Sequence, residues 1–271
     1  MLARQSFRVL SLDKELLLFP LLSGLSCILV LAGFVGGVWA TGMAQREDFA
    51  SETASWVILF LYYFASYFVI VFFNSALVAC AMIRFQGGDP TVGDGLRAAG
   101  ERLAQIAAWA LLAATVGVVL RIIEQRVEAI GRIVVSLLGA AWTIAAYFVV
   151  PVLVVEKLGP VDAFKRSAMI MKKAWGESLV SNVGIGLITF LVGFVFVVTT
   201  VIGTAVLAVN MGSFAVLWAG IAVLVVLLIL LALVSSALNS IVLCALYLYA
   251  SEDKMPEAFE GTGLQQAFGT R

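Results

Sequence analysis

Side chains capable of acid–base, metal or nucleophilic chemistry are scarce in this sequence. Its 271 residues include no histidine, which excludes imidazole triads, histidine-ligated zinc and histidine-held haem. Three cysteines, Cys27, Cys80 and Cys244, lie far apart in apolar runs and form no CxxC pair, so neither a zinc knuckle nor a thioredoxin motif is present. We expect them to be small buried apolar residues.

Two acidic motifs, Gly88-Asp89 and Asp94-Gly95, resemble those of intramembrane enzymes only superficially. An intramembrane aspartyl protease needs aspartates inside two spans, and an alcohol phosphotransferase needs a second aspartate pair downstream. Both aspartates lie in a polar loop, and residues 95–150 contain no further aspartate. We interpret Asp89 and Asp94 as turn and capping residues, with Thr91 and Asp94 forming a helix cap. No catalytic residue, metal or cofactor is predicted.

The elements that position these few polar residues are membrane spans. The chain is 62% hydrophobic and 13% charged, whereas a soluble domain has about 45–50% and about 25%. A helix needs about 20 apolar residues to cross a bilayer core about 30 Å thick. Five stretches lack Asp, Glu, Lys and Arg: 16–45, 53–83, 103–120, 133–155 and 178–251.

The last of these stretches is long enough to hold two spans, so it must fold back. The turn is predicted at residues 209–213, where Asn, Gly and Ser cluster, and six spans are expected. The final span, 214–250, exceeds the bilayer. Either its end leaves the membrane, or it kinks near the Ser- and Asn-rich segment 235–240.

The sequence therefore predicts an all-α polytopic membrane protein, with residues 1–271 as a single integral membrane domain ending in a tail at 251–271. With six spans, the two termini and every second loop lie on one side of the membrane. Thirteen of the 17 Lys and Arg residues fall on that side. The positive-inside rule then predicts both termini in the cytoplasm, and the protein is expected in the plasma (inner) membrane. The 17 acidic residues balance the basic ones, so no nucleic-acid partner is expected.

Similar span endings suggest an internal repeat. Asn74-Ser75-Ala76 near the end of the second span matches Asn239-Ser240 in the sixth, and a proline follows each in the next polar segment. Three parallel units, each an interfacial amphipathic helix followed by a two-span hairpin, are predicted at about 3–84, 91–156 and 161–250.

The interfacial segment 160–177 is the strongest candidate for a functional surface. Its apolar residues recur with helical spacing on one face: Val161, Phe164, Ala168, Met171 and Trp175. The candidate lipid or partner surface consists of its cations with the terminal tryptophan: Lys165, Arg166, Lys172, Lys173 and Trp175. A solvated loop is the alternative, and orientation alone also demands positive charge there.

Within the spans, the candidate polar residues are Asn74, Asn182 and Asn239. Hydrogen bonding between helices is one interpretation, and the lining of a polar pocket is the other. Coupling to protons or sodium is not expected, because no span contains an acidic residue.

Four segments carry a family likeness: 12–20, Pro151–Glu156 with Leu158-Gly159-Pro160, 163–167 and 174–177. With these segments the chain resembles an uncharacterised prokaryotic membrane-protein family, the domain of unknown function 6159. The motif around Pro160 is distantly similar to membrane domains that accompany glycerophosphodiester phosphodiesterases. The resemblance implies a six-span membrane protein and brings no catalytic residues.

These observations favour a non-enzymatic membrane component that binds membrane lipid, or a cytoplasmic or membrane protein partner, through its interfacial helices. A channel or uncoupled permease for a small solute is the alternative, motivated by the Asn and Ser residues of the even spans. An enzyme acting on lipid is a third hypothesis, with acids only at the surface. The oligomeric state stays open.

Overall fold

Every regular element in the described part of the chain is helical. The computed structural model describes residues 6, 10–45, 53–173, 175–211 and 213–252, without the side chains of residues 44, 175–185 and 252. The elements are η1 (Lys14–Leu17), α2 (Leu18–Ala40), η2 (Met43–Gln45), α3 (Thr53–Phe85), α4 (Val92–Gly100), α5 (Leu103–Arg126), α6 (Ala129–Ala145), α7 (Val149–Val155), α8 (Pro160–Lys173), α9 (Trp175–Met211) and α10 (Ala215–Glu252).

Six helical segments are long and apolar enough to cross a membrane, which identifies a multi-pass membrane protein. They are Lys14–Ala40, Thr53–Phe85, Leu103–Arg126, Ala129–Val155, Gly186–Met211 and Ala215–Ser251. Helices satisfy their own backbone hydrogen bonds, as the hydrocarbon core requires. The turn predicted at 209–213 is confirmed, because α9 ends at Met211 and α10 begins at Ala215.

The last span is one continuous helix, and the two predicted alternatives for its excess length stay predictions. α10 runs without interruption through residues 235–240, where Ser240 Oγ donates to the carbonyl of Ser236. The fourth span is interrupted instead, between α6 and α7 at residues 146–148. Pro151 explains this break, because it has no N–H to donate to the carbonyl of Tyr147.

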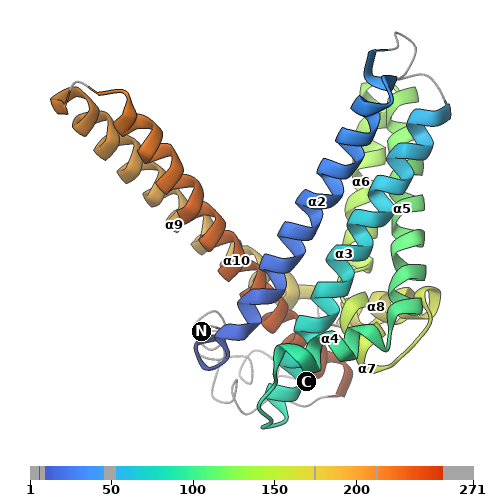
Figure 1. Ribbon diagram of the computed structural model, residues 1–271. Coiled ribbons are helices and arrows are strands. Elements are labelled where there is room, and N and C mark those ends of the chain that lie inside the picture. The colour runs from blue at the N-terminus through green and yellow to red at the C-terminus, as the bar shows by residue number, and fades with distance from the viewer. Residues whose placement is uncertain (1–5, 7–9, 46–52, 174, 212, 253–271) are drawn as a thin grey trace.

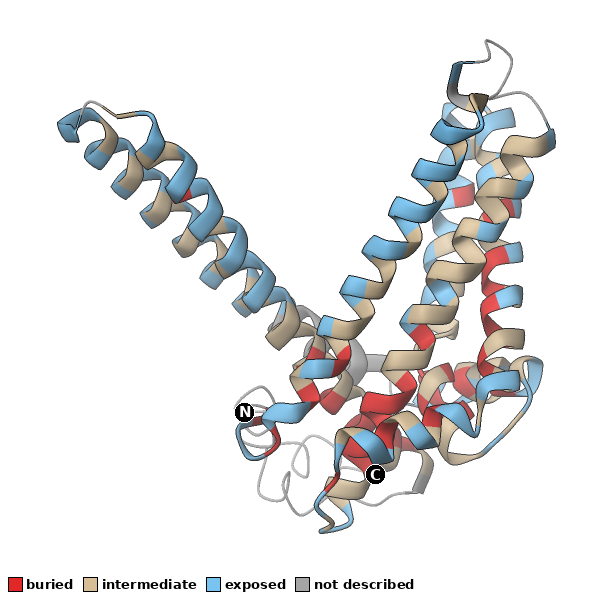
Figure 2. Ribbon diagram, viewed as in Figure 1, coloured by how far each residue is buried: buried red, intermediate tan, exposed pale blue. Residues whose placement is uncertain are grey.

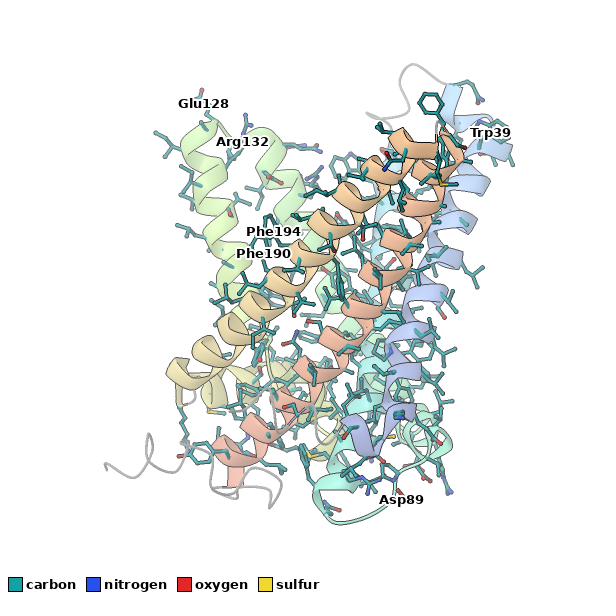
Figure 3. The ribbon with its side chains drawn as sticks, turned by 90° about the vertical axis from the view of Figure 1, so that its left-hand side faces the viewer. Trp39, Asp89, Glu128, Arg132, Phe190 and Phe194 are labelled. Atoms are coloured by element: carbon teal, nitrogen blue, oxygen red, sulfur yellow. The ribbon has the colours of Figure 1, made fainter. Side chains whose placement is uncertain are left out.

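The spans form a V (Figure 1). α2, α3, α5 and α6 make one arm, which we call the bundle, and α9 with α10 makes the other, which we call the hairpin. The arms meet at one end with η1, α4, α7 and α8, and this end is called the base. The opposite end, which carries Trp39 near the end of α2 and Glu128 and Arg132 at the start of α6, is called the far end (Figure 3).

Most of the well-packed core lies in the base, and buried residues of α5 continue it into the bundle (Figure 2). The last turns of α3 and α10 are buried there against α5, α7 and α8. The largest fully buried side chains of this core include Tyr247, Phe19, Phe148, Ile170 and Ile241. The end of the long final span therefore packs within the base.

The two helices of the hairpin pack closely on each other, while their outer surfaces are exposed. A Cβ at Gly220 would lie 2.1 Å from Cγ2 of Thr204, so α9 and α10 touch where the glycine leaves room. The hydroxyls of Thr189 and Ser235 share a hydrogen bond of 2.9 Å across the two helices. No residue of the most apolar part of α9 between Gly186 and Met211 is buried. These are the features of a two-helix unit surrounded by lipid.

Candidate functional site

The candidate surface predicted on residues 160–177 lies at the base, on α8. The side of α8 that faces the protein presents Ala163, Ser167, Ile170 and Met171, all buried. Their spacing of four, three and one residues is that of a single helical stripe. Val161, from the predicted apolar face, is instead exposed. α8 therefore docks on the ends of the spans, while its other side faces outward.

Aromatic stacking fixes the first half of α8. The ring of Phe164 stacks on Trp142 of α6 with a centroid distance of 4.6 Å, and on Trp109 of α5 at 6.2 Å. The two tryptophans also stack on each other at 5.7 Å. Aromatic pairs at such distances contribute about 0.5–1.5 kcal/mol beyond their buried area. The cluster thus joins α8 to two spans of the bundle.

Ser167 completes the broken fourth span. Its hydroxyl donates to the carbonyl of Ala145 at 2.6 Å and accepts from the backbone N–H of Phe148 at 2.9 Å. Both partners flank the break between α6 and α7, where the helix cannot pair all of its own backbone groups. Because Ser167 is fully buried, water does not reach these two backbone groups, and the Ser167 hydroxyl provides their hydrogen-bond partner instead.

An ion-pair network ties α8 to α7 and α10. The guanidinium Nε of Arg166 donates to both carboxylate oxygens of Glu156, at 2.9 and 3.1 Å. The hydroxyl of the buried Tyr247 donates to the same carboxylate at 3.0 Å. Arg166, predicted as part of the candidate surface, therefore has its charge engaged within the base.

The other predicted cations of α8 are exposed and are paired weakly or not at all among the described residues. Lys165 is exposed and pairs only loosely with Asp162 at 3.7 Å. Lys172 and Lys173 are exposed at the end of α8, and neither has an ion pair in the part of the chain that the structure describes. The side chains of Trp175 and Asn182, also predicted as candidates, lie outside the described residues.

Lys157 is a cation of the same region that sequence reasoning missed. It follows the C-cap of α7, and its φ of 60° lies in the left-handed region that favours glycine. Its side chain is exposed and forms no ion pair with any described residue. The sequence shows its charge on the predicted cytoplasmic side, but its exposure and positive φ are visible only in the structure.

The short helix α4 is capped as predicted. Thr91 Oγ accepts from the N–H of Asp94, and the Asp94 carboxylate accepts from the N–H of Thr91 at 2.9 Å. The hydrogen bonds from the side chain and backbone of Thr91 hold the pKa of Asp94 below its usual value. Asp94 thus serves as a capping residue of α4.

A second charge cluster closes the base beside α4. Arg84, at the end of α3, donates to both carboxylate oxygens of the buried Asp13 and to Asp89 at 2.6 Å. The segment before η1 and the loop before α4 are thereby held on the same cation. Asp89 is thus an ion-pair partner, in keeping with its interpretation as a loop residue.

The predicted intramembrane asparagines lie on different helices, Asn74 on α3 and Asn239 on α10, and both are half-buried. Neither amide has a hydrogen bond to another described residue. The two helices contact each other near the base. A shared role for the asparagines stays a prediction.

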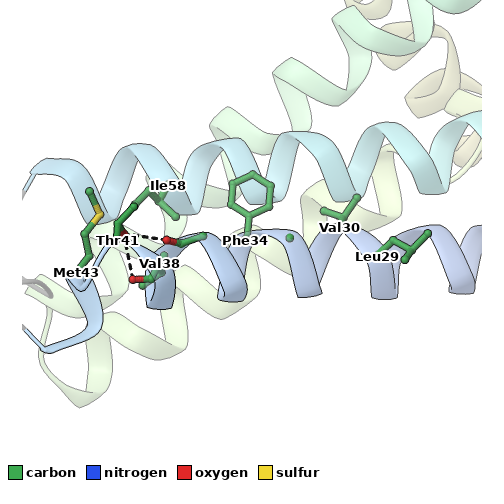
Figure 4. A pocket seen from close by; sticks show the side chains of 9 residues that line it. Leu29, Val30, Phe34, Val38, Thr41, Met43 and Ile58 are labelled. Carbon is green, nitrogen blue, oxygen red and sulfur yellow. Dashed lines mark hydrogen bonds between the residues drawn. The ribbon is translucent and has the colours of Figure 1, made fainter.

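One apolar groove of about 460 Å³ runs along α2 towards the far end (Figure 4). It is lined by Leu29, Val30, Gly33, Phe34, Gly37, Val38, Thr41, Met43 and Ile58. Its one hydroxyl, on Thr41, donates to the carbonyls of Gly37 and Val38 and is not free. The groove therefore offers shape without polar chemistry. Among the described residues, no three His, Cys, Asp or Glu side chains gather as metal ligands do.

Comparison with known proteins gives one match. Residues 53–256 match the model of a family of unknown function (DUF6159). No curated protein and no solved structure matches the chain.

Proposed function

The chain belongs to this family of unknown function, and we propose that it is a non-enzymatic membrane component whose base binds anionic lipid headgroups. The proposed binding surface extends along α8, with Lys157 just before the helix and Lys172 and Lys173 at its end, about 20 Å further on. These three residues are together called the lysine site. The observation that carries the proposal is the charge balance of the base, where these lysines are exposed and unpaired among the described residues.

Most acidic residues of the base already form ion pairs. Asp13 and Asp89 neutralise Arg84, Glu156 accepts from Arg166, and Glu101 pairs with Arg97. Glu15, Asp94 and Asp162 lie at the same end, so the described side chains of the base comprise nine Lys and Arg against seven Asp and Glu. A small positive excess remains there, and the lysine site contributes to it. Each Lys or Arg near an anionic membrane surface contributes about 1 kcal/mol of attraction.

The position of the lysines supports a headgroup ligand. Lys172 and Lys173 end α8, and the chain enters α9, whose apolar part spans from Gly186 to Met211, shortly afterwards. Lysines so close to a span lie within reach of the membrane interface, where their apolar stems pack on lipid and their ammonium groups meet phosphates. With the base in the cytoplasm, as the positive-inside rule indicates, the ligand would be the anionic lipid of the inner leaflet.

The test is the lipid that surrounds the purified protein. The protein is reconstituted in nanodiscs of mixed phosphatidylcholine and phosphatidylglycerol, and enrichment of phosphatidylglycerol near it is measured with a spin-labelled lipid. The triple variant Lys157→Gln, Lys172→Gln, Lys173→Gln should lose most of the enrichment, by about fivefold for each lysine at low salt. The control variant, Arg97→Gln with Arg121→Gln, removes two cations that already pair with Glu101 and Glu124 and should keep the enrichment.

Unchanged enrichment in the triple variant would sink the proposal, provided the protein elutes as the wild type does. Loss of a co-purifying protein without any change in lipid enrichment would also overturn it, because the lysine site would then serve a protein partner.

A further inference from the structure

We infer that residues 252–260, at the start of the C-terminal tail and called the acidic segment, dock on the outward face of α8. There they compete with lipid headgroups for the lysine site. The docking follows from α8 and the tail themselves, whereas the competition rests on the function proposed above. Residues 253–271 lie outside the described part of the chain.

The outward face of α8 combines apolar side chains with lysines. Four exposed residues follow one another at spacings of four, four and three, which is a single helical stripe: Val161, Lys165, Met169 and Lys172. We call them the outer stripe. Val161 and Met169 are 51% and 54% exposed, although the opposite side of the helix is buried in the base. Such a stripe fits a partner that brings apolar side chains and negative charge together.

The acidic segment has this complementary composition. It contains four acidic residues against one lysine: Glu252, Asp253, Glu257, Glu260 and Lys254. Three apolar residues lie among them, Met255, Ala258 and Phe259. Exposed ion pairs are weak singly, so several must act together with apolar contact. Because the tail and α8 belong to one chain, a short tether holds the two at an effective concentration of about a millimolar, and weak contacts suffice.

The chain leaves α10 within reach of the outer stripe. The hydroxyl of Tyr247 on α10 bonds to Glu156, and the same carboxylate pairs with Arg166 of α8. α10 ends at Glu252, about 8 Å further along its axis, and this end lies at the base with α8 (Figure 1). Residues 253–260 can extend over about 26 Å, whereas α8 is about 21 Å long. The acidic segment can therefore lie along the stripe.

Docking of the acidic segment regulates the lysine site because Lys172 belongs to both surfaces. Carboxylates and lipid phosphates bind the same ammonium group, so the two ligands exclude each other at this residue. The tail therefore lowers the apparent affinity of the lysine site for anionic lipid. A membrane rich in anionic lipid shifts the balance and displaces the tail.

A disulfide between the tail and α8 tests the docking. Met169→Cys and Ala258→Cys are combined in the full chain, with Cys27, Cys80 and Cys244 replaced by alanine. The protein is oxidised with copper phenanthroline in an uncharged maltoside detergent. Thiols that stay free are then counted by the gel shift that a polyethylene-glycol maleimide causes. The two cysteines should form a disulfide within one chain.

A control pair shows whether the disulfide depends on the outer stripe. Gly100→Cys with Ala258→Cys places the first thiol on α4, which also lies at the base, at an exposed position with open space around it. This pair should form several-fold less disulfide than the α8 pair. Equal yields from the two pairs, or a disulfide that joins two copies of the chain, would overturn the docking.

A neutral tail tests the role of charge and the effect on lipid. Asp253→Asn, Glu257→Gln and Glu260→Gln in the full chain should lower the disulfide yield of the α8 pair about fivefold, because each exposed ion pair contributes a factor of about 1.4 to 5. With Met169 and the native cysteines kept, the same neutral tail should raise phosphatidylglycerol enrichment in nanodiscs by about twofold, as expected if the tail covers the site half of the time.

The two measurements separate failure of the docking from failure of the lipid site. The disulfide is measured without lipid, so a yield that ignores the tail charges overturns the docking whatever the lysine site binds. Enrichment that the triple lysine variant lowers but the neutral tail leaves unchanged overturns the competition alone. Enrichment that neither variant changes, beside a charge-dependent disulfide, overturns the proposed function and the competition with it, while the docking stands.

Discussion

Gly95 is the residue of the base with the least room for a side chain. A Cβ at this position would lie 2.7 Å from Sγ of Cys80, 2.7 Å from Cζ of Phe19 and 2.8 Å from the carbonyl oxygen of Ala76. The glycine thus allows α4 to approach both α3 and α2. Sulfur and ring atoms can shift, but the backbone oxygen cannot shift without moving α3.

We predict that Gly95→Ala destabilises the protein by about 1–3 kcal/mol, the usual cost of overpacking a filled core. The fraction that stays monodisperse after heating in detergent measures this effect. Gly100→Ala on the same helix is the matched control, because nothing lies within 4 Å of its Cβ position. Equal melting of the two variants would contradict the close approach at Gly95.

A substitution at Lys157 should affect thermal stability and lipid binding in opposite directions. Its φ of 60° is a conformation that glycine adopts without penalty, so Lys157→Gly should leave thermal stability unchanged or raise it by about 0.5–1 kcal/mol. The same substitution should lower phosphatidylglycerol enrichment, because it removes one ammonium of the lysine site. A glycine variant that is more stable and binds lipid unchanged would show that this lysine is not part of the site.

The Arg166–Glu156 pair can be examined by a double-mutant cycle. Removing one partner leaves the other charge half-buried without its counterion, which is more costly than removing both. Arg166→Gln and Glu156→Gln should therefore each lower the melting temperature, while the double variant should melt near the less stable single variant or above it. Additive losses would mean that the two side chains act independently.

At the scale of elements, α4 is a short helix that depends on its cap. Thr91→Ala should cost about 1 kcal/mol and speed amide hydrogen exchange over residues 92–100. The pKa of Asp94 is lower in the folded state, so the carboxylate stabilises the cap above its ordinary pKa of 3.8 and loses this effect as the pH falls through the folded value.

The pH dependence gives the cap a direct test. Asp94→Asn should speed exchange in α4 relative to the wild type near neutral pH, and the two proteins should become alike below the folded pKa of Asp94. A difference that persists after Asp94 is protonated would mean that the substitution acts through something other than the carboxylate charge. Asp89→Asn serves as the comparison, since this residue pairs with Arg84 outside the helix.

How far the sequence leads is clearest at this scale. Runs without charge predict the six spans, and the spacing of Thr91 and Asp94 predicts the cap, because these features depend on neighbours in the sequence. The break at residues 146–148 follows from Pro151, yet its satisfaction by Ser167 depends on a helix that arrives later in the chain. Such contacts between distant segments leave no local pattern.

The candidate site shows the same division. The helical pattern predicts exposed Lys172 and Lys173, whereas the engagement of Arg166 by Glu156 depends on how α7 and α8 meet. The units predicted as repeats follow the same order of a short helix and two spans at α4–α7 and at α8–α10. Their arrangement differs, because one pair of spans packs in the bundle and the other stands apart (Figure 1).

At the scale of the whole molecule, the placement of charge predicts which end faces the cytoplasm. The base gathers the ends of the spans with α4 and α8, and an even number of spans returns the chain to the side where it began. Most of the cations fall on this side, and the positive-inside rule therefore orients the base inward. The far end, with Arg121, Arg126 and Arg132, would then face outward.

Single cysteines at the two ends test this orientation. In a background with the three native cysteines replaced by alanine, Ile130→Cys at the far end should react with a membrane-impermeant maleimide in intact cells. Lys172→Cys at the base should react only after the membrane is opened, because its thiol would lie in the cytoplasm. Both positions are exposed, so slow labelling would reflect the membrane rather than burial. The reverse pattern would turn the lysine site towards the outer leaflet, and the lipid proposal would then have to name a headgroup found there.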